Sequence, residues 1–198
     1  MYLIALISAR MEVFMNSVKI MMEEHQNILR MLKVMRNACY HVMVNNEVNY
    51  DDFAAMIDFI RSYADSHHHG KEEKLMFKKM QEHMGKIGEN LITHGMLVEH
   101  DLGRLHMQEL EEALQRVKTG DDESRLDVIA NAISYTHLLE RHIKKEDELV
   151  YPFGEKQLTP EILEQINEET KVFEEVATKQ NTQATYLSIL ENLEMRYM

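Results

Sequence analysis

The sequence has few of the residues that break helices or cross-link chains. Its 198 residues include two prolines, seven glycines, one cysteine and no tryptophan. The single cysteine, Cys39, excludes a disulfide framework within the chain, and it excludes a zinc or iron–sulfur site made of several of the chain's own thiolates. It also indicates a reducing compartment, so we expect a cytoplasmic protein.

The sequence also lacks a long apolar run and an excess of positive charge. No window supplies the roughly 20 apolar residues that a membrane-spanning helix needs. The apolar residues 2–7 have neither the basic flank nor the cleavage site of a signal peptide. The formal net charge of −12 argues against a polyanionic partner. We therefore expect no membrane and no nucleic acid among the partners.

The residues that are present are typical of long helices. Hydrophobic residues make up 44% of the chain and charged residues 28%, which is enough for both a core and a solvated surface. Apolar residues recur every three or four positions through four long segments, which predicts four amphipathic helices. These segments cover residues 11–43, 51–84, 88–118 and 122–152, with turns at 85–88 and 119–122. We expect the last helix to end at Pro152.

Four long helices joined by short turns predict an all-α fold, an up-down-up-down four-helix bundle with additional C-terminal helices. Thr159 followed by Pro160 is typical of a helix start, and the two further helices are expected at 160–179 and 182–197. The expected parts are a bundle over residues 15–153, a C-terminal helical extension over 154–198 and an N-terminal extension over 1–14. Asn16 before Ser17 is typical of a helix cap.

The stretch SHHHGKEE at residues 66–73 contains three histidines followed by two glutamates. Side chains four apart on a helix share a face. His68 and Glu72 continue the apolar line of Ala64 and are expected to face the interior. His69 continues a polar line and is expected to face water or a rim, and His67 is the weaker candidate.

The same spacing recurs at His142 and Glu146, again on an apolar face. His25 and His100 add one histidine to the apolar face of each remaining helix. A single buried histidine is more often a hydrogen-bonded core residue than a ligand. Buried imidazoles and carboxylates are costly unless paired or bound to metal, so the whole set favours a shared metal site. The predicted metal ligands are His25, His68, Glu72, His100, His142 and Glu146.

Nitrogen and carboxylate ligands without thiolate suit iron, manganese or zinc. Four imidazoles and two carboxylates are too many for one tetrahedral zinc ion. They fit two octahedral metals that the carboxylates bridge. With one oxo or hydroxo bridge, roughly two coordination positions remain for water or a small ligand.

Four motifs resemble the hemerythrin-like (HHE cation-binding) domain family: MMEEH at 21–25, HHGKEEKLMF at 68–77, THGMLVEHDLGRL at 93–105 and HIKKEDELVYP at 142–152. The resemblance implies a non-heme di-iron centre of the bacterial four-His two-Glu type, with the same six residues as ligands. Oxygen-carrying hemerythrins have a further histidine where this chain has Met96. They use an aspartate where this chain has Asp147, but Glu146 has the better helical phase.

The resemblance therefore implies a protein with two iron ions that binds or reduces dioxygen, peroxide or nitric oxide, supplied with electrons by an unidentified donor. The alternative is an iron or oxygen sensor without turnover. Ferritin-like iron storage uses a glutamate three residues before a histidine, and no histidine here has one. A metal-free bundle with buried histidines is the remaining alternative. The sequence leaves open whether the protein is an enzyme, whether the metal is iron or manganese, whether it forms an oligomer, and what the C-terminal helices do.

Overall fold

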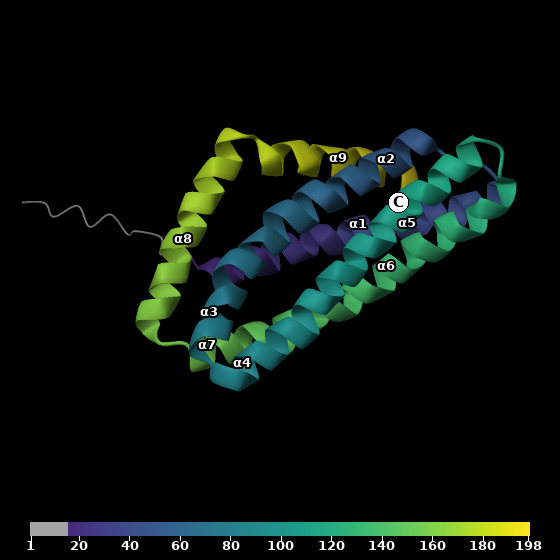
Figure 1. Ribbon diagram of the computed structural model, residues 1–198. Coiled ribbons are helices and arrows are strands. Elements are labelled where there is room, and N and C mark those ends of the chain that lie inside the picture. Colours follow the sequence, from purple (N-terminus) through teal and green to yellow (C-terminus); the bar gives the residue numbers. More distant parts are fainter. Residues whose placement is uncertain (1–15) are drawn as a thin grey trace, which may run out of the picture.

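Four helical rods and two further helices make up nearly all of the chain described by the computed structural model, which covers residues 16–198 (Figure 1). The predicted N-terminal extension, residues 1–14, lies outside the described residues. No strand occurs within 16–198, and successive rods run antiparallel through short connections. The predicted all-α, up-down-up-down bundle is confirmed.

The first rod is the helix α1 (Ser17–Asn45). Asn16 has extended backbone angles, and its side chain accepts a hydrogen bond from Lys19 N at 2.7 Å. This is the N-cap that the sequence predicts, and α1 begins at Ser17; residues 11–15, which the sequence assigns to the same helix, lie outside the described residues. At the other end Asn46 adopts the left-handed conformation, with a φ of 57°, and closes the helix.

The other three rods each contain π-helical segments. The second rod consists of α2 (Tyr50–Phe59), η1 (Ile60–His69), η2 (Glu72–Met76) and α3 (Phe77–His83), with η1 and η2 π-helical. The third consists of α4 (Gly85–Leu91), the π-helical η3 (Ile92–Met96) and α5 (Leu97–Lys118). The fourth consists of the 3₁₀ turn η4 (Asp122–Ser124), α6 (Arg125–Lys145), the π-helical η5 (Glu146–Val150) and α7 (Tyr151–Gln157). Since π-helical turns are rare and gather at functional sites, their positions point to the middle of the rods.

Two predicted helix boundaries are wrong. Pro152 does not end the fourth rod: it lies in the first turn of α7, directly after the wider π-helical turn, and the helix continues to Gln157. The turn expected at 85–88 is confined to Met84 and Gly85, whose φ is 58°. Gly88 is already helical, and a Cβ there would lie 2.3 Å from the carbonyl oxygen of Met80. Gly88 therefore permits a close approach of two helices instead of forming a turn.

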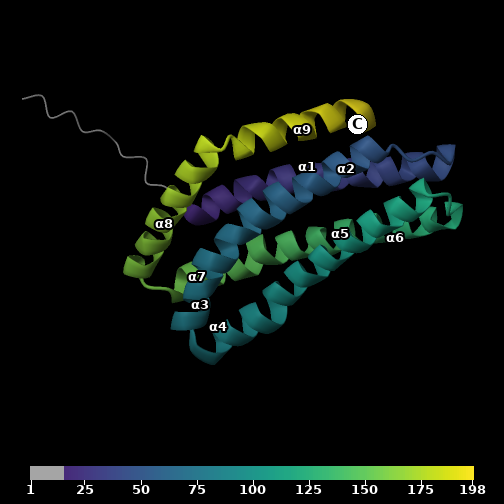
Figure 2. The same cartoon turned by 45° about the horizontal axis from the view of Figure 1, so that its top comes forward.

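The C-terminal helices α8 (Pro160–Lys179) and α9 (Thr182–Tyr197) have the predicted bounds. Figures 1 and 2 show α8 lying across the end of the bundle where α1 begins, and α9 running back beside α1 and α2. The Ser17 and Thr170 hydroxyl oxygens are 2.7 Å apart, and Leu190 is completely buried in the main apolar core. Both helices thus cover the bundle.

Two apolar clusters fill the bundle, one toward each end. One includes Ile28, Phe59, Leu110 and Leu139, and the other includes Met21, Met76, Phe77, Met96 and Tyr151. Along every rod, the buried histidines and glutamates lie between these two clusters. No helix within residues 16–198 is long and apolar enough to cross a membrane.

Candidate metal centre

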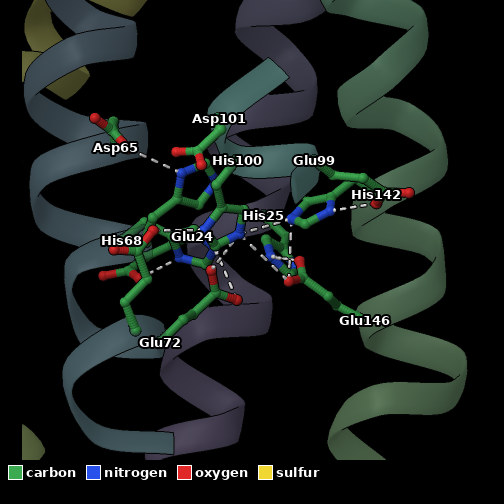
Figure 3. A network of polar contacts seen from close by, with 12 residues as sticks. Glu24, His25, Asp65, His68, Glu72, Glu99, His100, Asp101, His142 and Glu146 are labelled. Carbon is green, nitrogen blue, oxygen red and sulfur yellow. Dashed lines mark hydrogen bonds and ion pairs between the residues drawn. The ribbon is translucent and has the colours of Figure 1, made fainter. Parts of the chain in front are cut away.

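The six predicted ligands lie together in the middle of the bundle, and Figure 3 shows their rings and carboxylates pointing toward one another. They are His25 on α1, His68 on η1, Glu72 on η2, His100 on α5, His142 on α6 and Glu146 on η5. Each of the six is at most 1% exposed. All four rods therefore contribute to a single buried polar cluster.

Glu72 directs its two carboxylate oxygens at histidines from different rods. Its Oε1 lies 3.6 Å from Nε2 of His68, and its Oε2 lies 3.5 Å from Nε2 of His100. Carboxylates that bridge two metal ions present one oxygen to each ion. The position of Glu72 would suit a ligand shared by two cations.

Glu146 repeats this arrangement from the opposite rod. Its Oε2 lies 3.4 Å from Nε2 of His25, and its Oε1 lies 3.0 Å from Nε2 of His142. The two glutamates therefore divide the cluster into two candidate cation positions. We name the one beside His25 and His68 position A, and the one beside His100 and His142 position B.

A ring of four outer carboxylates holds the histidines: three come from the rod before the histidine they contact, and Asp147, on the last rod, contacts His25 on the first. The distances from carboxylate oxygen to Nδ1 are 2.9 Å for Glu24 to His68, 2.7 Å for Glu73 to His100, 2.8 Å for Glu99 to His142 and 2.7 Å for Asp147 to His25. Each of these acids is a direct sequence neighbour of a residue in the cluster. Asp147 thus supports His25 from outside, while Glu146 faces the interior.

The outer ring decides which nitrogen carries the hydrogen when each of the four imidazoles is neutral. An ionised carboxylate can only accept a hydrogen bond, so each Nδ1 carries the hydrogen and donates it. The lone pair then lies on Nε2, which faces the cluster interior. Metal-binding histidines in proteins are oriented in this way by carboxylate partners.

The interior atoms lack partners of their own. Within residues 16–198, the buried side-chain nitrogens and oxygens without a hydrogen bond are His25 Nε2, His68 Nε2, Glu72 Oε2 and both carboxylate oxygens of Glu146. Each unsatisfied buried polar group costs about 1–3 kcal/mol. All five atoms converge on positions A and B, so bound cations would satisfy all of them at once. The donor set fits two metal ions.

The spacing at position B also fits a metal ion. Nε2 of His100 and Nε2 of His142 are 3.0 Å apart. With the hydrogens on Nδ1, two lone pairs would face each other, which is repulsive unless a proton or a cation sits between them. Two metal–nitrogen bonds of about 2.1 Å at a right angle would put the nitrogens about 3 Å apart.

Without bound cations, the histidines and glutamates of the cluster balance their charges by taking up protons. Burial opposes a charged His142, but the charge of the nearby Glu146 and the hydrogen bond to Glu99 raise its pKa to about 10. Burial and the charge of Glu146 raise the pKa of Glu72 to about 8. Burial also disfavours ionised Glu146, yet the nearby histidines hold its pKa well below the usual range. Cations at A and B would replace these protons.

Of the two orientations expected for His69, toward water or toward a rim, the first is wrong, and the side chain lines the pocket beside Gly103. His69 is 4% exposed, and its ring stacks on that of His100 with centroids 3.8 Å apart. Helix η1 is π-helical, so each turn holds more residues than an α-helical turn and successive side chains rotate less about the axis. His67, His68 and His69 consequently all reach the interior, which a 3.6-residue period does not predict.

Tyr151 is a site residue that the sequence pattern missed. It is completely buried, and its hydroxyl donates a hydrogen bond to Glu72 Oε1. Tyr135 is instead a core residue beside Gly103, and no hydrogen bond to its hydroxyl occurs within residues 16–198. A pocket of about 500 Å³ opens on the outer side of His100 and Gly103.

The comparison with protein families agrees with this geometry. The model of the hemerythrin HHE cation-binding domain matches residues 16–153, which contain all four rods up to α7. No curated protein sequence matches the chain. The match covers the whole cluster of buried histidines and glutamates, so a cation-binding role applies to the cluster itself.

Proposed function

This chain belongs to the hemerythrin HHE cation-binding domain family, and we propose that it is a non-heme di-iron protein that binds or reduces a small oxidant. Dioxygen, peroxide and nitric oxide are the candidate oxidants. The observation that carries the proposal is the orientation of Glu72 and Glu146, each of which directs one oxygen at position A and the other at position B.

The proposed ligands are His25, His68, Glu72, His100, His142 and Glu146. When bound, a pair of iron ions supplies electrons and an open coordination position for the oxidant. Nitrogen and carboxylate ligands suit iron, and the absence of thiolate argues against a copper(I) or iron–sulfur site. The apolar clusters at both ends of the site keep bulk water away, which strengthens the interactions of the site residues with charge.

The outer carboxylates have a separate role. By accepting hydrogen bonds from Nδ1, they orient the four imidazoles toward the interior and raise the basicity of Nε2, the nitrogen that would bind a cation. Tyr151 can hold a proton at Glu72 Oε1, on the side of position A. An electron donor has to reach the site from outside.

A sensor without turnover is the second candidate, and one observation favours it. His68 contacts Glu24, Glu24 pairs with the buried Lys71, and Lys71 pairs with Glu174 on α8. A shift of His68 on ligand binding would therefore be felt by a C-terminal helix. In a sensor the bound ligand would persist, whereas in an enzyme it would be consumed.

The first experiment loads the full chain with iron(II) without air and measures bound iron. We expect two irons per chain, and we expect Glu146→Ala to lose at least one. Glu148→Ala is the matched control, because Glu148 lies in the same segment with its side chain 62% exposed. Equal iron contents in both variants would contradict the proposal.

The second experiment mixes the reduced, iron-loaded protein with dioxygen and follows the optical spectrum. A charge-transfer band that lasts and disappears under vacuum would favour reversible binding, as in a carrier or sensor. A band that forms and decays to an oxidised spectrum would favour turnover. Loaded protein that neither changes its spectrum nor oxidises its iron would contradict an oxidant-handling role.

A further inference from the structure

A second pocket, of about 510 Å³, lies where the second rod meets the two C-terminal helices. Its walls include His67 on η1, Phe173 on α8 and Tyr186 on α9. Both C-terminal helices follow residue 153, the last residue that the family model matches, so the pocket is not a feature of the cation-binding domain alone. Its volume is typical of sites for small organic molecules, which range from about 300 to 1,000 Å³.

His67 has one ring nitrogen that the protein does not use. The side chain is 4% exposed, and its Nε2 lies 2.9 Å from Oε1 of Glu24 and 3.1 Å from Nζ of Lys71. No hydrogen bond to its Nδ1 occurs within residues 16–198. Nδ1 is therefore the atom of His67 that is available to a molecule in the pocket. It donates in one tautomer and accepts in the other, and a hydroxyl group can pair with either.

Three aromatic rings surround the same cavity. The rings of His67 and Phe173 are tilted by 46°, with centroids 5.7 Å apart, and Tyr186 supplies the third. Aromatic rings attract one another in offset or edge-on arrangements, at centroid distances of about 4.5–7 Å. The lining therefore favours a ligand that is itself aromatic.

The charges around the pocket favour an uncharged ligand. Glu169, at the exposed rim, is the one carboxylate or ammonium group among the lining residues, and solvent screens its attraction for a cation. The nearest buried cation, Lys71, is already paired with Glu24 and Glu174. An anion in the pocket would therefore lack a partner, and the net charge of −12 would also repel it.

We propose that this pocket binds an uncharged aromatic molecule that carries a hydroxyl group. The hydroxyl pairs with Nδ1 of His67, and the ring lies beside Phe173 and Tyr186. The proposal does not depend on the di-iron function, because none of these residues is among the six predicted metal ligands. It assigns the C-terminal helices a role beyond that of covering the bundle.

The test uses the full chain without added metal and the probe 2-naphthol, in isothermal titration calorimetry at pH 7. The hydroxyl of 2-naphthol, like that of tyrosine, stays protonated at this pH. We expect one molecule to bind per chain. Naphthalene-2-carboxylate has the same two rings but a negative charge, so it should bind at least about 10-fold more weakly.

Two variants locate the binding site. In His67→Gln the terminal amide can take the place of Nε2 beside Glu24 and Lys71, but nothing replaces Nδ1. The loss of one hydrogen bond should weaken 2-naphthol binding about 3- to 10-fold. Phe173→Ala removes one aromatic wall and should weaken binding at least about 5-fold. His94→Gln, at an exposed histidine on the third rod, is the control and should bind 2-naphthol as the unaltered protein does.

Circular dichroism establishes that each variant is folded, and Phe173→Leu replaces Phe173→Ala if the alanine variant is not. No binding of 2-naphthol by the unaltered protein would overturn the proposal. An affinity of His67→Gln or of the Phe173 variant equal to that of His94→Gln would overturn the placement of the ligand in this pocket. Equal affinities for 2-naphthol and naphthalene-2-carboxylate would overturn the preference for an uncharged ligand.

Discussion

Lys71, completely buried in the second rod, forms an ion pair with Glu174 on α8. The same ammonium group pairs with Glu24, whose other oxygen lies 2.9 Å from Nδ1 of His68. Glu24, His67 and Glu174 lie close enough to hold a cation of their own, but Lys71 already places its charge among them. This group is an ion-pair network that joins the metal centre to the C-terminal helices.

Replacing Lys71 with methionine should destabilise the protein strongly. Glu24 is 5% exposed, and loss of one partner of a buried ion pair typically costs about 3–5 kcal/mol of unfolding free energy. Urea unfolding followed by circular dichroism measures the loss. Lys144→Met is the control, because its side chain is 71% exposed and 3.9 Å from Glu148, and such pairs contribute about 0–1 kcal/mol. Similar losses in both variants would show that Lys71 is not buried as described.

Leu190 tests whether α9 belongs to the folded core. Leu190 is 0% exposed and packs in the main apolar cluster, so Leu190→Ala should lower the unfolding free energy by about 2–5 kcal/mol. Met195 on the same helix is 78% exposed, and Met195→Ala should change the unfolding free energy by less than about 0.5 kcal/mol. Chemical denaturation of the two variants measures both changes in unfolding free energy. A small effect at Leu190 would mean that α9 detaches from the bundle.

The parts of the site that helical spacing predicts are those in which two residues mark one face together. His68 with Glu72, and His142 with Glu146, are four residues apart and follow apolar lines, so their inward orientation could be read directly. The orientation of the outer carboxylates could not be predicted from helical spacing, because the histidines that they contact lie on other rods. A usable signal existed, since Glu24, Glu73, Glu99 and Asp147 each adjoin a predicted ligand in sequence.

The errors have one main cause, which is the assumption of a constant α-helical period. A constant period places His69 on the polar face, because Asp65 and Arg61 precede it at intervals of four. The π-helical turns of η1 change that relation, and no residue in the sequence marks them. A π-helical turn also precedes Pro152, so the helix passes a proline that normally ends one.

Cys39 should be unreactive in the folded protein. It is 2% exposed, and burial raises the pKa of its thiol to about 12, against an opposing contribution from Arg36. Because the thiolate is the reactive form, the folded protein at pH 8 should hold about a thousandfold less of it than the unfolded chain. A disulfide reagent such as DTNB should therefore titrate one thiol per chain in denaturant and almost none without it. Equal rates in both conditions would contradict the burial of Cys39.

Tyr151 and Tyr135 form a matched pair of buried tyrosines, one at the site and one away from it. Tyr151→Phe removes the donor to Glu72 Oε1 and should lower the unfolding free energy of chelator-treated protein by about 1–3 kcal/mol. Tyr135→Phe removes a hydroxyl for which no hydrogen bond occurs within residues 16–198, so its effect should stay below about 0.5 kcal/mol.

Bound metal should reduce the difference in unfolding free energy between Tyr151→Phe and the unaltered protein. A cation at position A would interact with Glu72 Oε1 directly, so the loss of the tyrosine hydroxyl leaves that oxygen satisfied. Thermal unfolding of each protein with and without two bound metal ions gives the comparison. If the loss in Tyr151→Phe were as large with metal as without it, Glu72 Oε1 would not be a ligand at A. Glu72 would then bind only at position B, and the bridge between the two positions would rest on Glu146 alone.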